Sequence, residues 1–150
     1  TAWIDNIVVG SATYTVFGSP CPGSGSIAPL IGAAGTPGLG SIDWKINVKS
    51  AFGPTVGLLN LGINNASWAG LPLPFDIGGQ CGILVAPIYT VGAPLVGAGA
   101  GQGAGEVPLP IPNNPALQGA MLYGQWWVID AGSGSWTGLA LSAGIMFKIL

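Results

Sequence analysis

Apolar and polar residues alternate regularly between residues 41 and 50. Apolar residues occupy the even positions from Ile42 to Val48, and polar or charged residues occupy the odd positions from Asp43 to Lys49. Successive side chains of a β-strand point to opposite faces. This period of two therefore predicts a strand with one buried and one solvated face.

Other segments have patterns of a different kind. Residues 55–63 are apolar on both faces, which is typical of a strand in the middle of a sheet or beneath a subunit contact. Residues 91–106 are rich in glycine and alanine, which fits either a flexible loop or a flat strand of small side chains. Apolar and β-branched residues predict further strands at residues 3–17 (with a break at 10–11), 27–31, 81–88, 121–130 and 139–150.

Glycine and proline separate these segments and leave little room for helix. The chain has 27 glycines and 13 prolines among its 150 residues. Asn114 followed by Pro115 has the order of a helix cap and a first helical residue, which predicts a single helical turn. The sequence therefore predicts an all-β fold, a two-sheet β-sandwich of about eight to ten strands with jelly-roll or immunoglobulin-like order.

A chain of 150 residues is long enough for one domain with a sizeable core. We expect an N-terminal strand extension over residues 1–16 and a single β-sandwich domain over residues 17–150. The chain begins at Thr1 without a basic, apolar leader, which favours a mature secreted form. No run of about 18 apolar residues occurs, so no transmembrane segment is expected.

Charged residues are scarce. Three lysines and five acidic residues make up 5% of the chain, whereas about 25% is usual for soluble domains. So few charges do little to keep copies of a protein apart in water, which indicates that other copies cover much of the surface. The absence of a basic patch argues against nucleic-acid binding.

The chain also lacks histidine and arginine. This removes Ser-His-Asp and Cys-His catalytic sets as well as histidine metal sites. Asp5, Asp76 and Asp130 offer oxygen ligands for calcium, but the sequence has no acidic loop with the spacing of a calcium site. We therefore expect no enzymatic activity, no metal and no cofactor.

The six tryptophans allow two interpretations. Trp68, Trp126 and Trp136 lie near predicted turns or strand ends, where exposed aromatic rings would serve a glycan-binding surface. Packing in the core or in an interface is the simpler alternative, because a buried tryptophan removes a large area from water. Trp126 and Trp127 are adjacent in a strand, so one faces the core and the other an outer surface.

Cys21 and Cys81 are the two cysteines of the chain. An even count in a chain of secreted character favours one disulfide. Two buried free thiols in a reducing compartment are the alternative.

Several segments, taken in order, resemble those of one known family. The matching sequences are FGSPCPGSG at 17–25, PGLG at 37–40, LLNLG at 58–62, LPLPFD at 71–76, QCGIL at 80–84, IPNNPALQG at 111–119, YGQWW at 123–127 and LSAG at 141–144. Together they resemble a secreted β-sandwich domain found, often near the C-terminal end, in large exported proteins of planctomycete-type environmental bacteria. The resemblance implies a Cys21–Cys81 disulfide, an extracellular location and no enzymatic activity.

The residues before the matching part form the candidate functional element. We expect the protein to be the subunit of an extracellular filament or surface layer, with itself as partner. An N-terminal strand of one copy would add to an open sheet edge of the next by donor-strand exchange. Its apolar residues are Trp3, Ile4, Ile7, Val8 and Val9. The alternative is a secreted adhesin or carbohydrate-binding β-sandwich that binds surface glycans.

Overall fold

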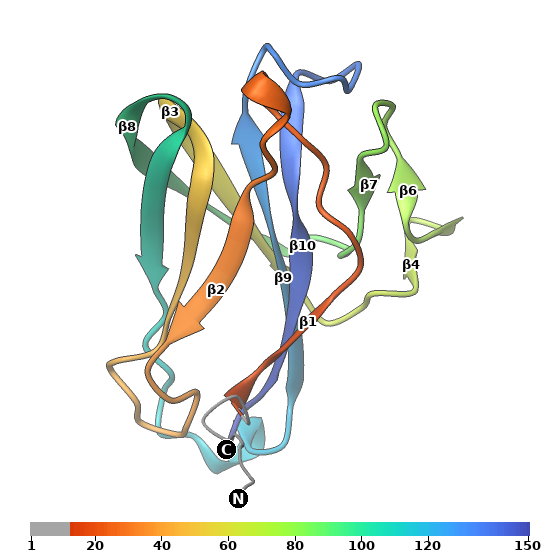
Figure 1. Ribbon diagram of the computed structural model, residues 1–150. Helices are drawn as coiled ribbons and strands as arrows, with labels where there is room; N and C mark the ends of the chain where they lie inside the picture. The colour runs from red at the N-terminus through yellow and green to blue at the C-terminus, as the bar shows by residue number, and fades with distance from the viewer. Residues whose placement is uncertain (1–12) are drawn as a thin grey trace, which may run out of the picture.

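The computed structural model describes residues 13–150, which fold mainly into antiparallel strands (Figure 1). The strands are β1 (Thr15–Phe17), β2 (Leu30–Ala34), β3 (Lys45–Gly62), β4 (Ser67–Trp68), β5 (Leu71–Pro72), β6 (Phe75–Asp76), β7 (Gly82–Ile83), β8 (Tyr89–Pro108), β9 (Met121–Ile129) and β10 (Leu139–Lys148). Short 3₁₀ turns occur at η2 (Ser24–Ser26) and η3 (Pro115–Leu117). The all-β prediction is confirmed, as is the helical turn at Pro115. No helix within residues 13–150 has the length and apolar character that crossing a membrane requires.

Six strands form one continuous sheet in the order β1-β10-β9-β3-β2, with β8 also paired to β3. The first part of β3, residues 45–49, pairs with β2, and its last part, residues 57–62, pairs with β9. β8 pairs with β3 along both parts. The two halves of the sheet are therefore joined by one long antiparallel strand pair, β3 and β8, which Figure 1 shows at the left of the molecule.

Glycines allow the β3–β8 strand pair to bend between its two halves. The register between the strands shifts three times between Val48 and Thr55. A Cβ atom on Gly103 would lie 2.3 Å from the carbonyl oxygen of Phe52, so only glycine fits there. The segment 91–106, for which the sequence allowed either a flexible loop or a flat strand, is part of strand β8 and crosses the bend. The two predicted strands at 41–50 and 55–63 are likewise parts of one strand.

The main core lies between the two halves of the sheet. Trp44 and Ile46 of the first half pack in one buried cluster with Trp126 and Ile145 of the second. The indole Nε1 of Trp126 donates a hydrogen bond to the carbonyl oxygen of Asn47, 3.1 Å away. The alternation predicted for residues 41–50 therefore holds, with its even positions from Trp44 to Val48 buried. Ile42 precedes β3 and is exposed, so the predicted strand begins too early.

A smaller lobe contains the hairpins β4–β5 and β6–β7 and has its own core. The Cys21–Cys81 disulfide lies in this second core and joins it to the chain just before η2. The predicted disulfide is therefore confirmed. A strand was predicted at residues 81–88, but only β7 (Gly82–Ile83) within it pairs with another strand. Residues 84–86 are buried but do not belong to a strand.

Gln125 of β9 connects the lobe to the sheet through a fully buried polar network. Its Oε1 accepts from the Leu84 amide at 3.0 Å, and its Nε2 donates to the carbonyls of Gly82 and Ser142 at 3.0 and 2.9 Å. The Ser142 hydroxyl in turn accepts from the Trp126 amide at 2.9 Å. Ser142 sits where the register between β9 and β10 shifts, so the bulge turns its polar groups toward Gln125.

Asp130 holds the turn η2 in place. Its carboxylate accepts from the amide and the hydroxyl of Ser24, at 2.7 and 2.5 Å, and from the Gly132 amide at 2.9 Å. A Cβ atom on Gly23 would lie 2.3 Å from this carboxylate. The Gly23-Ser24 pair is therefore fixed by a buried acid that is distant in sequence.

The expected domain boundary between residues 16 and 17 falls inside β1. Thr15 to Phe17 pair with Met146 to Gly144 of β10, so the last residues of the expected extension belong to the domain. The jelly-roll or immunoglobulin-like strand order stays a prediction.

Candidate functional site

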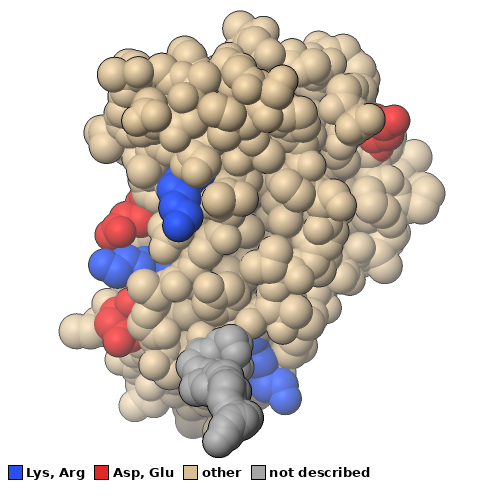
Figure 2. All heavy atoms as spheres, viewed as in Figure 1, with Lys and Arg blue, Asp and Glu red and all other residues tan. Residues whose placement is uncertain are grey.

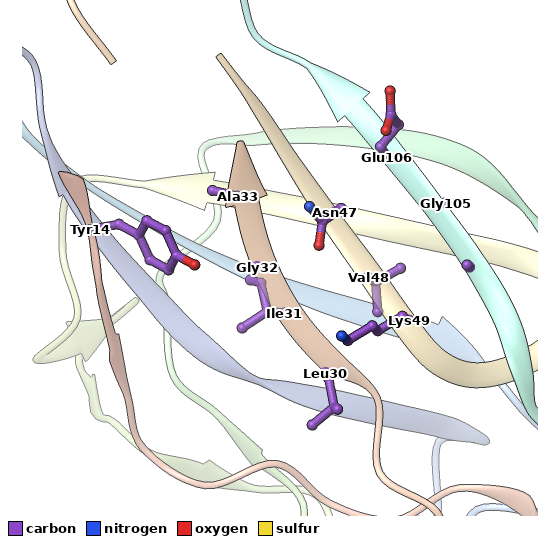
Figure 3. Close-up of a pocket in the computed structure, with 11 residues that line it drawn as sticks. Tyr14, Leu30, Ile31, Gly32, Ala33, Asn47, Val48, Lys49, Gly105 and Glu106 are labelled. Carbon is purple, nitrogen blue, oxygen red and sulfur yellow. The ribbon is translucent and has the colours of Figure 1, made fainter. Parts of the chain in front are cut away.

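A hollow of about 640 Å³ lies at the β2 edge of the sheet. Its walls come from β2, β3, β8 and the residue before β1, and its lining residues are Tyr14, Leu30–Ala33, Asn47–Lys49 and Ala104–Glu106. Figure 3 shows Tyr14 on one side of β2, and Asn47 and Lys49 on the other. The hollow is therefore spread along β2 and is open to solvent, with the shape of a shallow groove.

The centre of the hollow is formed by a close contact between β2 and β3. Gly32 pairs with Asn47, and a Cβ atom at position 32 would lie 2.9 Å from Asn47 Oδ1. Because Gly32 has no side chain, space remains over β2 at this point of the hollow. Leu30, two residues earlier on β2, projects beside this space and is 47% exposed.

β2 is an edge strand with little protection against further pairing. Its residues pair with β3 on one side, and no other described strand bonds to them. Native proteins usually block such edges with charged residues, proline or a bulge. β2 contains neither charge nor proline, since its sequence is LIGAA, and its register with β3 is regular.

The charges near the hollow lie mostly on the outer face of β3 and β8. Lys45 and Glu106 form an ion pair of 3.3 Å, and both side chains are largely exposed, so the pair adds little stability. Lys49 and Glu106 line the hollow itself. In Figure 2 most of the charged atoms in view lie on the side of β2 and β3, with further charged groups at the opposite side and at the lower end, and most of the visible face carries none.

Asp43 lies just before β3. Hydrogen bonds from the Ser41 hydroxyl at 2.6 Å and the Thr36 amide at 3.2 Å stabilise its carboxylate. These bonds, the Ser41 bond above all, hold the pKa of Asp43 below its ordinary value of 3.8. Asp43 therefore orders the approach to β3.

β8 and β1 provide two further open edges. β8 has 20 residues and pairs only with β3 among the described strands. β1 pairs only with β10 in the same part of the chain, and its Val16 is 49% exposed. Pro94 and Glu106 interrupt the β8 edge, whereas the β2 edge has no such residue. β1 (TVF) also lacks charge and proline but has only three residues, so β2, with five, is the longest edge without such protection.

An exposed apolar patch covers the outer face of the other half of the sheet. Val56, Val96 and Ile129 are 43%, 69% and 47% exposed. The Thr55 hydroxyl donates to the Ile129 carbonyl at 2.8 Å, which links β3 and β9 beside the patch. A contiguous exposed apolar patch can serve as an interaction surface.

The three candidate glycan-facing tryptophans do not form a common surface. Trp126 is fully buried in the core, so its assignment as a ligand-facing residue is wrong. Trp68 is partly buried and packs against Trp127 with ring centres 6.5 Å apart. Trp136 is 72% exposed. Of the adjacent pair, Trp126 faces the main core and Trp127 packs, half-buried, against the second core, so the expectation that one of them faces an outer surface is wrong.

The acidic residues considered as metal ligands lie in separate places. Asp76 accepts a hydrogen bond from the Gly78 amide at 2.7 Å, and Asp130 binds the η2 turn. Asp5 lies outside the described residues. Within residues 13–150, no group of three or more His, Cys, Asp or Glu side chains is placed to hold a metal ion.

The predicted assembly residues lie outside the part of the chain that the structure describes. They are Trp3, Ile4, Ile7, Val8 and Val9. The hollow at β2 was not predicted from the sequence, because its lining comes from segments more than 70 residues apart. The charge-free sequence LIGAA was the only local signal.

Comparisons with protein-family models, with curated proteins and with solved structures found no match. The resemblance to the secreted β-sandwich family therefore stays a prediction.

Proposed function

We propose that the protein is a structural subunit of an extracellular self-assembling filament or surface layer. The observation that carries this proposal is the β2 edge, which is unpaired, free of charge and proline, and bordered by the hollow. An edge of this kind is a template for pairing with another chain. The open edges of β1 and β8 and the scarcity of charge support the same conclusion.

The added strand is residues 3–9 of a neighbouring copy. Donor-strand addition uses main-chain hydrogen bonds for affinity and alternate side chains for specificity. In this segment Ile7 and Val9 alternate with Val8, so one face can fill the hollow while the other faces solvent or a further subunit. A head-to-tail contact of this kind does not close on itself, and it therefore produces a filament.

Electron microscopy of the full chain and of a variant lacking residues 1–10 tests the proposal. We expect regular filaments or sheets from the full chain and dispersed particles from the shortened chain. Circular dichroism of both confirms that the fold survives the deletion. A full chain that stays monomeric at high concentration contradicts self-assembly. Assembly of the shortened chain contradicts the donor-strand mechanism but is compatible with self-assembly.

Glycan binding is the second candidate function, because Trp136 is 72% exposed. An exposed indole face stacks on sugar rings in the same way that it packs on other apolar surfaces. A glycan array with the full chain and with Trp136→Ala tests this function. Binding that disappears in the variant supports an adhesin, and an array without binding contradicts it.

A further inference from the structure

An apolar cavity lies at one end of the main sheet, apart from the hollow. Leu122 of β9 pairs with Phe147 of β10, and both line the cavity, which has a volume of about 220 Å³. Leu61, Leu117 and Ile149 also belong to its wall, and no charged residue lines it. An engineered apolar cavity of about 150 Å³ binds benzene, so this cavity has room for a larger aromatic ring.

Trp136 lies at the opposite end of β9 and β10, in the loop that joins these two strands. The cavity is next to the start of β9, whereas the loop follows its last residue, Ile129. A strand rises about 3.3 Å per residue, so more than about 20 Å separates the two places. In Figure 1 the loop lies at the top of the molecule, and the C-terminus, which follows the cavity residue Ile149, lies at the bottom.

The indole of Trp136 is held in a fixed position. The Trp136 amide donates to the Ile77 carbonyl at 3.1 Å, and a Cβ atom on Gly78 would lie 2.6 Å from Trp136 Cδ1, so the ring rests on the turn between β6 and β7. The side chain is nevertheless 72% exposed. Its neighbours in the sequence GSGSWTG are small, so no bulky side chain next to it in the loop shields it. A side chain held in this way loses little conformational entropy when a partner buries it.

Exposed charges of opposite sign accompany the indole and the cavity. Asp76 lies near Trp136, because its carboxylate accepts a hydrogen bond from the Gly78 amide at 2.7 Å. Lys148 follows Phe147 at the cavity end, and neither Asp76 nor Lys148 forms an ion pair within residues 13–150. The other charged residues near this end already have hydrogen-bond or ion-pair partners, namely Asp43, Lys45 and Glu106. The two ends are therefore complementary in charge as well as in shape.

We propose that Trp136 of one copy inserts into the cavity of the next copy, with Asp76 beside Lys148. This contact rests on the self-assembly proposed above and adds a second attachment to it. Tryptophan is enriched among the residues that dominate binding energy, and such residues fill well-packed pockets. Because the indole and the cavity lie at opposite ends, the contact does not close on itself and repeats along a filament. Thr13 lines a pocket together with Phe147, so the donor segment before it leaves the subunit at the same end as the cavity.

Two variants of the full chain that each remove one half of the contact test the proposal. Trp136→Ala removes the exposed indole, and Leu117→Trp fills the cavity. We expect each to raise the subunit concentration at which assembly begins by about tenfold or more, as measured by light scattering. At a concentration where neither assembles alone, their equimolar mixture should form one-to-one pairs in sedimentation velocity, because one variant keeps the cavity and the other keeps the indole. Leu71→Ala, at a 46% exposed position of the β4–β5 hairpin, is the matched control and should assemble like the wild type.

Two charge variants test the same contact without changing the cavity. Lys148→Glu places two acids together and should raise the assembly concentration about threefold, an effect that should disappear in an Asp76→Asn background. Asp76→Asn keeps an oxygen acceptor for the Gly78 amide, so the turn beneath Trp136 is retained.

The outcomes separate this contact from the assembly on which it rests. Assembly of Trp136→Ala at the wild-type concentration overturns the contact, even where Leu117→Trp does not fold, and leaves self-assembly through the donor strand standing. An equal effect of Lys148→Glu in both backgrounds likewise overturns the pairing of the two ends. A wild-type chain that does not assemble at any concentration overturns both proposals.

Discussion

Trp126 of β9 donates its indole N–H to the carbonyl oxygen of Asn47 on β3, 3.1 Å away, and so joins the two halves of the sheet across the core. The side chain of Asn47 lines the hollow on the outer face. One residue therefore contributes its backbone to the core and its side chain to the candidate site. The hydrogen bond therefore ties the strand beneath the hollow to a fully buried core residue.

Gln125→Ala is expected to lower the free energy of unfolding by about 3 kcal/mol or more. The substitution leaves the amide of Leu84 and the carbonyls of Gly82 and Ser142 buried without these partners, and each unpaired group costs about 1–3 kcal/mol. Urea denaturation followed by tryptophan fluorescence measures the change. Gln102→Ala, at an exposed position of β8, is the control and should stay within about 0.5 kcal/mol. A loss below about 1 kcal/mol for Gln125→Ala would contradict the role of the network.

Gly103→Ala is expected to destabilise the fold by about 2 kcal/mol through overpacking at the bend of the β3–β8 strand pair. The new methyl group would lie 2.3 Å from the Phe52 carbonyl oxygen, and backbone has little freedom to move there. Gly92→Ala on the same strand is the matched control, because the nearest atom to its Cβ is 3.8 Å away. Thermal unfolding of both variants measures the difference. Equal melting temperatures would show that the bend does not depend on the close approach at Gly103.

Asp43 makes stability depend on pH in the acid range. Hydrogen bonds from Ser41 and Thr36 hold its pKa in the folded state below the ordinary value of 3.8. The stabilisation is therefore complete above that value and is lost as the pH falls through the lower pKa of the folded state. Asp43→Asn can keep both bonds, since both reach Oδ1, but it cannot titrate.

We expect the stability difference between the wild type and Asp43→Asn to be constant above pH 3.8 and to change only below it. Denaturation at a series of pH values measures this difference. Carboxyl NMR titration of Ser41→Ala supplies the control, because loss of the largest cause should move the pKa of Asp43 upward. A difference that changes mainly above pH 3.8 would contradict this assignment.

Local patterns were enough to predict the elements that depend on side chains. The alternation between Trp44 and Val48 predicted a strand with a buried face, since burial of one face imposes that period on the sequence. The order Asn114-Pro115 predicted η3, because the Asn114 side chain caps the Ala116 amide at 3.0 Å. The even count of cysteines favoured the Cys21–Cys81 disulfide.

Features that depend on backbone contacts between distant segments were not predictable in this way. Glycine and alanine have no side-chain pattern, so the sequence could not distinguish a loop from the bent strand β8. A period of two shows that Trp126 and Trp127 face opposite ways, but that Trp127 meets a second core depends on the lobe that packs beside β9. The hollow likewise depends on β2 pairing with β3 in one particular register.

Leu30→Lys is expected to abolish assembly while leaving the fold intact. Leu30 lines the hollow on the β2 edge and is 47% exposed, so a lysine there stays solvated in the free subunit. A charged side chain on an edge strand opposes the addition of another strand, which is how natural proteins protect such edges. Val16→Lys on the β1 edge is the matched control, since Val16 is 49% exposed at an edge that does not line the hollow. Electron microscopy and light scattering should show filaments from Val16→Lys and single particles from Leu30→Lys. The reverse result would place the acceptor edge at β1, and assembly of both variants would leave β8 as the edge that pairs.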